Sequence, residues 1–172
     1  MNDTQIYIRV GTSSDTEKLR AMFARSSTGT IYRRFHTPFP EVPGWMVSLM
    51  LDADHHDREA LVAVAEEKVV GHAMYVRLAD DGEAEMAILV EDGWQSKGVG
   101  KALLRELAGD ARDRGVETFV GSVLADNGPM FGLIGAVFAG SRRTIDDGAY
   151  LVRMPLRTLE PADPAQGLGR AA

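Results

Sequence analysis

Residues 94–104 read WQSKGVGKALL, with two glycines and two lysines directly before an amphipathic run. The strand-like segment AEMAILV (residues 84–90) precedes this stretch, and GKALLRELAGDARDRG (residues 100–115) has apolar residues at helical spacing. Small residues at the start of a helix leave backbone N–H groups uncovered, and the helix dipole adds positive potential there. The stretch therefore predicts a strand, a turn that binds an anion, and a helix. A glycine-rich connection without a ligand is the alternative.

The turn does not match the two common nucleotide-binding motifs. Gly93 and Gly98 have the spacing of a Walker A loop, but Val99 stands where that motif requires lysine. The third glycine of a Rossmann fingerprint would fall at Leu103. Both motifs are excluded at the residue that defines them.

Composition limits the class of protein. The chain has 172 residues, 45% of them hydrophobic, which suits one globular domain. The net charge of −6 argues against a nucleic-acid partner. The absence of cysteine excludes disulfides, thiolate metal sites and a cysteine nucleophile, and fits a reducing cytosol. No apolar run approaches the roughly 20 residues that cross a bilayer, so we expect a cytoplasmic protein without membrane contact.

The remaining pattern predicts a mixed α+β domain over residues 1–158, followed by a flexible tail at 159–172. We expect a tight turn at Glu67-Lys68 between two strands, and an N-cap at Ser14 or Asp15. The expected strands are residues 5–10, 59–67, 69–78, 83–92, 118–125 and 149–156, and the expected helices are 13–26, 44–54, 100–115 and 128–137.

One pattern in the turn has a known parallel. Val90, Gln95, Gly98 and Gly100 are spaced as Val-x-x-x-x-Gln-x-x-Gly-x-Gly, which resembles the acetyl-CoA signature of the GNAT N-acetyltransferase superfamily. Asn127, at the end of the following strand, also matches. The resemblance implies a central, mostly antiparallel sheet of six to seven strands, flanked by helices and splayed at the coenzyme site. It implies coenzyme contacts at Ile88, Leu89, Val90, Gln95, Ser96, Lys97, Gly98, Val99, Gly100, Lys101, Asn127 and Met130.

A second pattern narrows the resemblance. Ser27, Thr30, Tyr32, Arg34 and Phe35 fit Ser-x-x-Ser/Thr-x-Tyr-x-Arg-Phe, and the combination resembles the catalytic domain of bacterial Pat-type protein lysine acetyltransferases. This implies acetyl-CoA as co-substrate and a lysine-bearing protein as acceptor. Two alternatives stay open: an acetyltransferase for small amines such as polyamines, amino acids or antibiotics, and a non-catalytic acyl-CoA sensor.

Transfer to lysine requires an amine of pKa about 10.4 to lose a proton, which near pH 7 costs about 4–5 kcal/mol. Glu85 is the candidate base, and the resemblance places the glutamate base of the Pat-like pattern there. Because its neighbours on the strand are apolar, we expect partial burial that raises its pKa; a solvent-exposed carboxylate is the alternative. By similarity, a backbone N–H between Ile88 and Val90 polarises the acetyl carbonyl. The amine then attacks directly in a ternary complex.

In many members of the superfamily a tyrosine three residues after the asparagine donates a proton to the leaving thiolate. Met130 stands at that position, which leaves the general acid open.

Other polar residues have simpler explanations. The segment DADHHDRE (residues 52–59) contains metal-ligand residue types, but we expect it at a helix C-terminus, where such side chains are common, and we expect no metal. His36 lines the substrate mouth or packs in a loop, and His72 lies in the core. Lys97, Lys101 and the pair Arg142-Arg143 are either phosphate contacts or ordinary surface charges.

Overall fold

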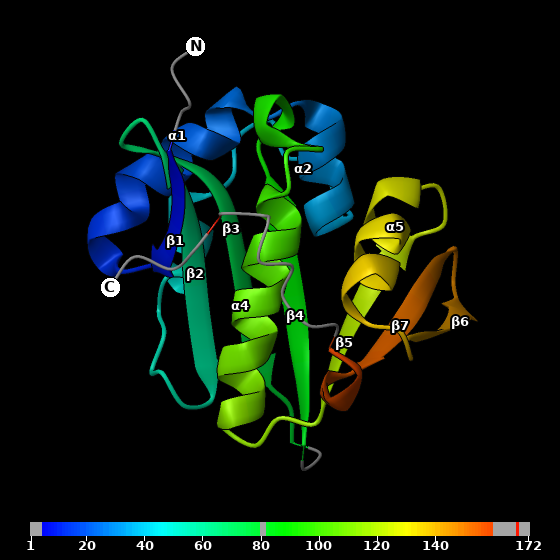
Figure 1. Cartoon of the computed structure of the whole chain (residues 1–172). Helices are drawn as coiled ribbons and strands as arrows, with labels where there is room; N and C mark the ends of the chain where they lie inside the picture. The colour runs from blue at the N-terminus through cyan, green and yellow to red at the C-terminus, as the bar shows by residue number, and fades with distance from the viewer. Residues whose placement is uncertain (1–4, 80–81, 160–167, 169–172) are drawn as a thin grey trace.

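A computed structural model describes residues 5–79, 82–159 and 168. One seven-stranded sheet has the order β1-β2-β3-β4-β5-β7-β6, with helices on both faces (Figure 1). The strands are β1 (Ile6–Val10), β2 (Arg58–Ala65), β3 (Lys68–Arg77), β4 (Glu83–Val90), β5 (Thr118–Leu124), β6 (Arg142–Asp146) and β7 (Ala149–Pro155). The helices are α1 (Thr16–Arg25), α2 (Thr28–Phe35), α3 (Gly44–Met50), α4 (Val99–Asp113) and α5 (Gly128–Val137). Short 3-10 turns lie at Ser13–Asp15, Asp92–Trp94 and Leu156–Thr158.

The sheet is mixed, with a break in its middle. Strands β4 and β5 run parallel, and the other neighbouring strands are antiparallel. β4 pairs with β5 only over residues 83–85 and 118–120, although β4 continues to Val90 and β5 to Leu124. The expected α+β class, strand number and splayed sheet are confirmed.

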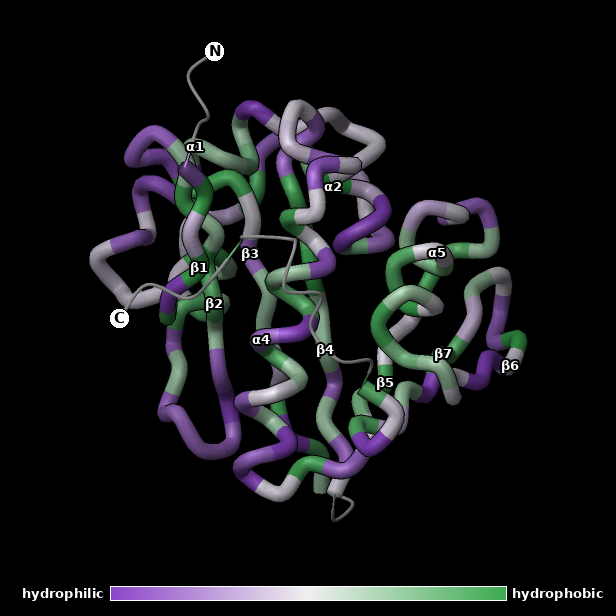
Figure 2. The backbone as a smooth tube through the Cα atoms, viewed as in Figure 1, coloured by the Kyte–Doolittle hydropathy of each residue, from purple (hydrophilic) through white to green (hydrophobic). Residues whose placement is uncertain are grey.

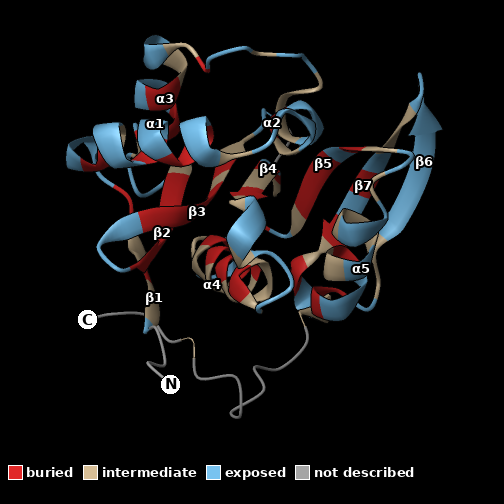
Figure 3. Cartoon of the chain, turned by 90° about the horizontal axis from the view of Figure 1, so that it is seen from above, coloured by how far each residue is buried: buried red, intermediate tan, exposed pale blue. Residues whose placement is uncertain are grey.

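Two cores lie on opposite faces of the sheet. Helices α4 and α5 pack with the larger cluster, which includes Leu103, Phe119 and Ile134. Helices α1 and α3 pack over β2 and β3, with Leu19 and Val62 in the second cluster. Figure 3 shows α1, α2 and α3 on one side of the sheet and α4 and α5 on the other. The strands are mainly hydrophobic where helices cover them, and the connecting loops are mainly hydrophilic (Figure 2).

The hairpin between β2 and β3 differs by one residue from the expected turn. Ala65 pairs with Lys68, so the two-residue turn is Glu66-Glu67 and not Glu67-Lys68. Both glutamates have positive φ, 50° and 62°, as a type I′ turn requires. Glycine and asparagine usually mark such turns, and neither is present to set the register.

An ion pair between Arg9 and Asp15 fixes the segment after β1. Asp15 precedes α1 as expected, but its carboxylate accepts hydrogen bonds from Arg9 at 2.7 Å and from the Thr12 N–H at 3.0 Å. The hydrogen bond from Arg9 is the main reason that the pKa of Asp15 falls below its usual value. Asp15 therefore ties the helix to the edge strand.

The C-terminal segment predicted as a tail begins at Leu159, which bridges to Phe138. Except for Leu159 and Leu168, that segment lies outside the described residues. Within the part of the chain that the structure describes, no helix combines the length and the apolar character needed to span a membrane.

His72, in β3, is buried as expected. Its Nε2 donates to the Met50 carbonyl oxygen at 3.1 Å, and its Nδ1 has no hydrogen-bond partner among the described residues. Burial, assisted by the charge of Arg34, lowers the pKa of His72 to about 4 from its ordinary 6.5.

Because the pKa of His72 is lowered in the folded protein, we expect the protein to lose stability in mild acid. The unfolded chain binds this proton below pH 6.5 and the folded chain does not, so stability is lost as the pH falls from 6.5 towards 4. We expect the free energy of unfolding to fall by about 2 kcal/mol between pH 7.5 and pH 5 from this group alone. His72→Gln, which keeps an N–H donor but does not titrate, removes this part of the pH dependence. Urea unfolding measures it, with the exposed His56→Gln as control; an equal pH dependence in wild type and His72→Gln would contradict the assignment.

Candidate active site

The break between β4 and β5 opens a groove of about 680 Å³. Its walls come from α2, β4, the turn after β4, the start of α4, the end of β5, and α5. The lining residues that the sequence had predicted are Glu85, Ile88, Leu89, Val90, Gln95, Ser96, Gly98, Gly100, Lys101, Asn127 and Met130. His36 also lines the groove, as expected for one of its two alternatives. Segments far apart in the sequence therefore meet in one groove.

Two predicted residues are placed differently. The side chain of Val99 is buried in the core that α4 shares with the sheet. The ammonium group of Lys97 lies 4.9 Å from the centre of the Trp94 ring, a cation–π distance. Neither side chain lines the groove, although the backbone amide of Val99 belongs to the first turn of α4.

The turn before α4 has the backbone geometry of an anion site. Gly98 is the N-cap of α4 with φ of 82°, and Ser96 also has a positive φ, 59°. The first intrahelical bond joins the Ala102 N–H to the Gly98 carbonyl at 3.0 Å, so the amides of residues 99–101 have no acceptor within the helix. A helix of 15 residues adds its dipole at this end. The arrangement suits a ligand with several anionic oxygens.

The absence of a side chain at Gly100 leaves the helix amides uncovered and also allows close packing against α5 and β4. A Cβ on Gly100 would lie 3.3 Å from Leu133 Cδ2 of α5 and 3.6 Å from Val90 Cγ2. Glycine therefore lets α5 and the end of β4 approach the helix start closely. This closes the bottom of the groove beneath the exposed amides.

Gln95 braces the turn. Its Nε2 donates to the Val90 carbonyl oxygen at 2.9 Å and to Thr30 Oγ1 at 3.3 Å. The side-chain N–H groups of Gln95 thus connect the end of β4, the turn and α2. This contact explains the spacing of valine and glutamine in the signature.

Asp92 is a site residue that the sequence did not single out. Its carboxylate accepts from the Ser27 N–H at 2.8 Å, Ser27 Oγ at 2.7 Å and Thr30 Oγ1 at 2.9 Å. Burial alone would raise the pKa of Asp92, but these hydrogen bonds lower it below its usual value. Ser27 also caps α2 by accepting from the Thr30 N–H at 3.2 Å. The two hydroxyl positions of the Ser-x-x-Ser/Thr pattern therefore fasten α2 to the turn, a contact of high sequence separation that no local pattern reports.

The strand edge in the groove is open. Residues 86–90 of β4 pair with β3, and none of them pairs with β5. Backbone groups there that point away from β3 face the groove without a strand partner. The expected carbonyl-polarising amide, between Ile88 and Val90, belongs to this stretch.

Asn127 and Met130 lie on the opposite wall. Asn127 is the N-cap of α5, and its Oδ1 accepts from the Met130 N–H at 3.3 Å. Part of the hydrogen-bonding capacity of Asn127 is thus used to start the helix. Met130 lines the groove, and within the described residues no tyrosine does.

Glu85 lines the groove but is exposed, so the expected partial burial is wrong. The physical reason is the break in the sheet. Glu85 pairs with Val120 at the last position where β4 and β5 are joined, and the groove that opens beyond this position leaves its side chain accessible to solvent.

Arg34 of α2 supplies a positive charge next to Glu85. Burial lowers the pKa of Arg34 to about 10, and the negative charge of Glu85 acts against that fall. Arg34 Nη2 lies 3.8 Å from Met74 Sδ, and its buried Nε has no hydrogen-bond partner among the described residues. Arg34 belongs to the pattern of residues 27–35, but its proximity to Glu85 is visible only in the three-dimensional structure.

Within the segment of residues 52–59, residues 52–57 connect α3 to β2, and Arg58 and Glu59 begin β2. Asp54 Oδ1 accepts from the backbone N–H groups of His56, Asp57 and Arg58 at 2.8–2.9 Å, and the bonds from His56 and Arg58 are the main reason that its pKa falls to about 2. His55 contacts Glu59 at 3.1 Å. No group of three or more metal-ligand side chains occurs among the residues that the structure describes. These side chains organise the turn.

Comparisons with known proteins agree with this geometry. The sequence model of the acetyltransferase (GNAT) family matches this chain over residues 21–134. The GNAT domain of PAT from S. lividans is 30% identical, with a TM-score of 0.80, and the match covers 86% of this chain and 89% of that one. Acetyltransferase PA5475 of Pseudomonas aeruginosa is 28% identical over 156 residues, which are 88% of this chain and 84% of that protein. The putative acetyltransferase yncA of Salmonella typhimurium, solved with its cofactor acetyl-CoA, shares the fold at 18% identity and a TM-score of 0.71, with 92% of this chain and 98% of that one covered. The family model spans most of the chain, and the groove, the turn and the splayed strands lie in or beside that span: this protein is an acetyltransferase of the GNAT family.

Proposed function

We propose that the protein transfers an acetyl group from acetyl-CoA to the side-chain amine of a lysine in another protein. The main support for this proposal is that the N-terminal amides of α4 and the side chain of Glu85 lie along a single groove. The helix start receives the anionic end of the coenzyme, and the open edge of β4 leads from there to the carboxylate.

The coenzyme part of the proposal rests on the turn. A diphosphate carries several oxygens, and the amides of residues 99–101 with the α4 dipole provide donors and positive potential. Lys101 also lines the groove and adds a cationic side chain at this end. The Salmonella protein that shares the fold was solved with acetyl-CoA, which supports acetyl-CoA as the co-substrate.

The pantetheine arm and the thioester would lie between the separated strands. The open edge of β4 supplies N–H donors of the kind that stabilise a developing oxyanion. The amine attacks the thioester carbon, a C–N bond forms, and the C–S bond breaks to release the thiolate of coenzyme A.

Glu85 is the proposed proton acceptor. Because it is exposed, it accepts the amine proton through water, and Arg34 provides a nearby positive charge that attracts and orients the carboxylate. The amine must become neutral before or during attack, so a base at this position speeds the reaction near neutral pH.

The acceptor class rests on two observations. The Ser27-to-Phe35 pattern builds α2, which borders the groove beside Glu85. This chain is also 30% identical in sequence to the GNAT domain of S. lividans PAT. A cytoplasmic location is part of the same proposal and fits a chain without cysteine.

The phosphate turn predicts a charge effect at Gly98. Asparagine and aspartate tolerate positive φ to a similar degree and have similar size, so Gly98→Asp and Gly98→Asn differ chiefly in charge. We expect Gly98→Asp to bind coenzyme A about tenfold or more weakly than Gly98→Asn, because its carboxylate repels the diphosphate. Titration calorimetry measures both, and thermal unfolding checks that the variants are equally folded. Equal affinities would place the diphosphate elsewhere.

The proposed base predicts a pH-dependent defect in Glu85→Gln. We expect kcat near pH 7 to fall about 100-fold or more, while affinity for acetyl-CoA stays unchanged. The defect shrinks towards pH 10, because a larger fraction of the acceptor amine is then neutral without a base. Initial rates from pH 6.5 to 10 test this. A constant ratio between wild type and variant across the range would count against proton acceptance by Glu85.

The acceptor class is tested with proteins and small amines side by side. We expect co-expression to acetylate lysines of specific proteins, detected by mass spectrometry, with Glu85→Gln as the control. Faster acetyl-CoA consumption with polyamines, amino acids or aminoglycosides than with any protein would favour a small-molecule acetyltransferase. Binding of acetyl-CoA without transfer to any amine would favour a sensor.

A further inference from the structure

On one face of the C-terminal half of the sheet, none of the described helices covers the strands. Helices α1, α2 and α3 lie on the Glu85 side of the sheet but end at β4, and α5 covers β5 and β7 from the other side (Figure 3). On the uncovered face, Ser122, Thr144, Leu151 and Arg153 are exposed. This surface begins where Glu85 lines the groove.

The strand register connects this surface to Glu85. Glu85 pairs with Val120, Val120 with Arg153, and Arg153 with Arg142. Directly paired residues project to the same face of a sheet, so these side chains form one row. With strands about 4.8 Å apart, Arg153 lies about 10 Å and Arg142 about 14 Å from Glu85 along the row.

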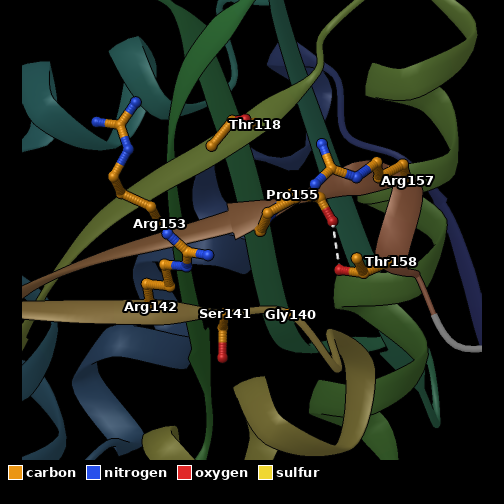
Figure 4. Close-up of a pocket in the computed structure, with 8 residues that line it drawn as sticks. All are labelled: Thr118, Gly140, Ser141, Arg142, Arg153, Pro155, Arg157 and Thr158. Carbon is orange, nitrogen blue, oxygen red and sulfur yellow. Dashed lines mark hydrogen bonds between the residues drawn. The ribbon is translucent and has the colours of Figure 1, made fainter.

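A second cavity, of about 530 Å³, lies at this end of the row. Arg142, Arg153 and Arg157 line it together with Thr118 and Ser141 (Figure 4). In Figure 4, Arg142 and Arg153 lie on one side of Pro155 and Arg157 on the other. Three different elements, β6, β7 and the turn Leu156–Thr158, thus contribute arginines to the lining of one cavity. The guanidinium group of Arg153, which is paired with Glu83, points away from the other two (Figure 4).

The charge of this cavity is only partly neutralised. Arg153 forms an ion pair with Glu83, whereas Arg142 and Arg157 have no ion pair within the described part of the chain. Arg142 and Arg153 stand directly opposite each other on neighbouring strands, where like charges destabilise a sheet. The whole chain has a net charge of −6, so this local excess of positive charge runs against the composition. Such a cluster favours an anionic ligand.

The chemistry of the cavity suits carboxylates. Guanidinium groups bind carboxylates through paired N–H donors, and exposed arginines at a protein surface do so without a large desolvation penalty. Asp146 and Asp147 lie at the opposite end of β6 and repel an acidic ligand there. An acidic segment is therefore attracted to the Arg142 end of β6 and repelled from the Asp146 end.

We propose that Arg142, Arg153 and Arg157 form a docking site for acidic residues of the protein acceptor, next to the lysine that reacts at Glu85. The inference rests on the proposed function and names the substrate class within it: lysines with aspartate or glutamate close by in an extended segment. An extended chain advances about 3.3 Å per residue, so a separation of about 10–14 Å corresponds to an acid three or four residues from the lysine. A small amine bound beside Glu85 does not span this distance.

Two matched peptides test the docking site. Each has one lysine in a neutral sequence, with glutamate at the third and fourth positions from it in the first peptide and glutamine in the second. We expect wild type to acetylate the glutamate peptide with a kcat/KM about tenfold or more above that of the glutamine peptide. In Arg142→Glu/Arg157→Glu this preference is lost, while the rate with the glutamine peptide and the affinity for coenzyme A are unchanged. A peptide with lysines at the third and fourth positions becomes a better substrate of the double variant than of wild type.

Controls keep the outcomes distinct. Arg112→Glu changes an exposed arginine on α4, on the other face of the sheet, and retains the preference. Peptide binding to the coenzyme A complex, followed by fluorescence anisotropy, is measured in parallel with turnover. Equal binding of both peptides to wild type, or an equal loss of both in the double variant, overturns the docking site. Selective binding of the glutamate peptide without acetylation by wild type supports the docking site and contradicts the proposed transfer reaction.

Discussion

The break in hydrogen bonding between β4 and β5 is the constraint on which the site depends. The strands join over three residue pairs and then separate, and the space between them is the groove. On the side that faces β5, the backbone groups of residues 86–90 have no strand partner. Such unpaired groups are costly in a buried sheet unless a ligand or water pairs with them. In the proposed reaction, the N–H groups among them would donate to the thioester carbonyl. The break also exposes Glu85, the last residue of β4 that is joined to β5.

A separated pair of strands needs support from outside the sheet, and hydrogen bonds from α2 provide it. Asp92 and Gln95 join the turn after β4 to Ser27 and Thr30, more than sixty residues earlier in the chain. On the other side, the glycine at position 100 lets Leu133 of α5 reach the start of α4. The amides of the helix start are thus held between two helices and do not depend on the turn alone for their orientation.

The local parts of the fold followed from the sequence because their signals are local. Periodicity located six of the seven strands and α4, and glycine spacing located the turn at residues 94–101. The edge strand β6 was missed, and all its residues are exposed, so it has no alternation of apolar and polar residues that would mark it. The hairpin was displaced by one residue because Glu66 and Glu67 adopt positive φ without glycine or asparagine. The helix at residues 28–35 and the role of Asp92 were missed, since both depend on contacts distant in sequence. The burial expected for Glu85 was wrong for a related reason: alternation assigns a face to a side chain and cannot show whether another element covers that face.

The same uncovered face would give the proposed protein acceptor room beside Glu85. In the N-terminal half of the sheet, α1 and α3 pack over β2 and β3 and bury that part of the surface. In the C-terminal half, the row from Glu85 through Val120 to Arg153 and Arg142 is open to solvent at its arginine end. The coenzyme groove and the open row meet at Glu85, with the helix start at one end and the arginines at the other. The arginine end keeps an excess of positive charge, although Glu83 on β4 is paired with Arg153. Glu85 is the carboxylate that stands in the row itself. A lysine guided by acidic neighbours would therefore meet favourable charge at its flanks from the arginines and at its amine from Glu85.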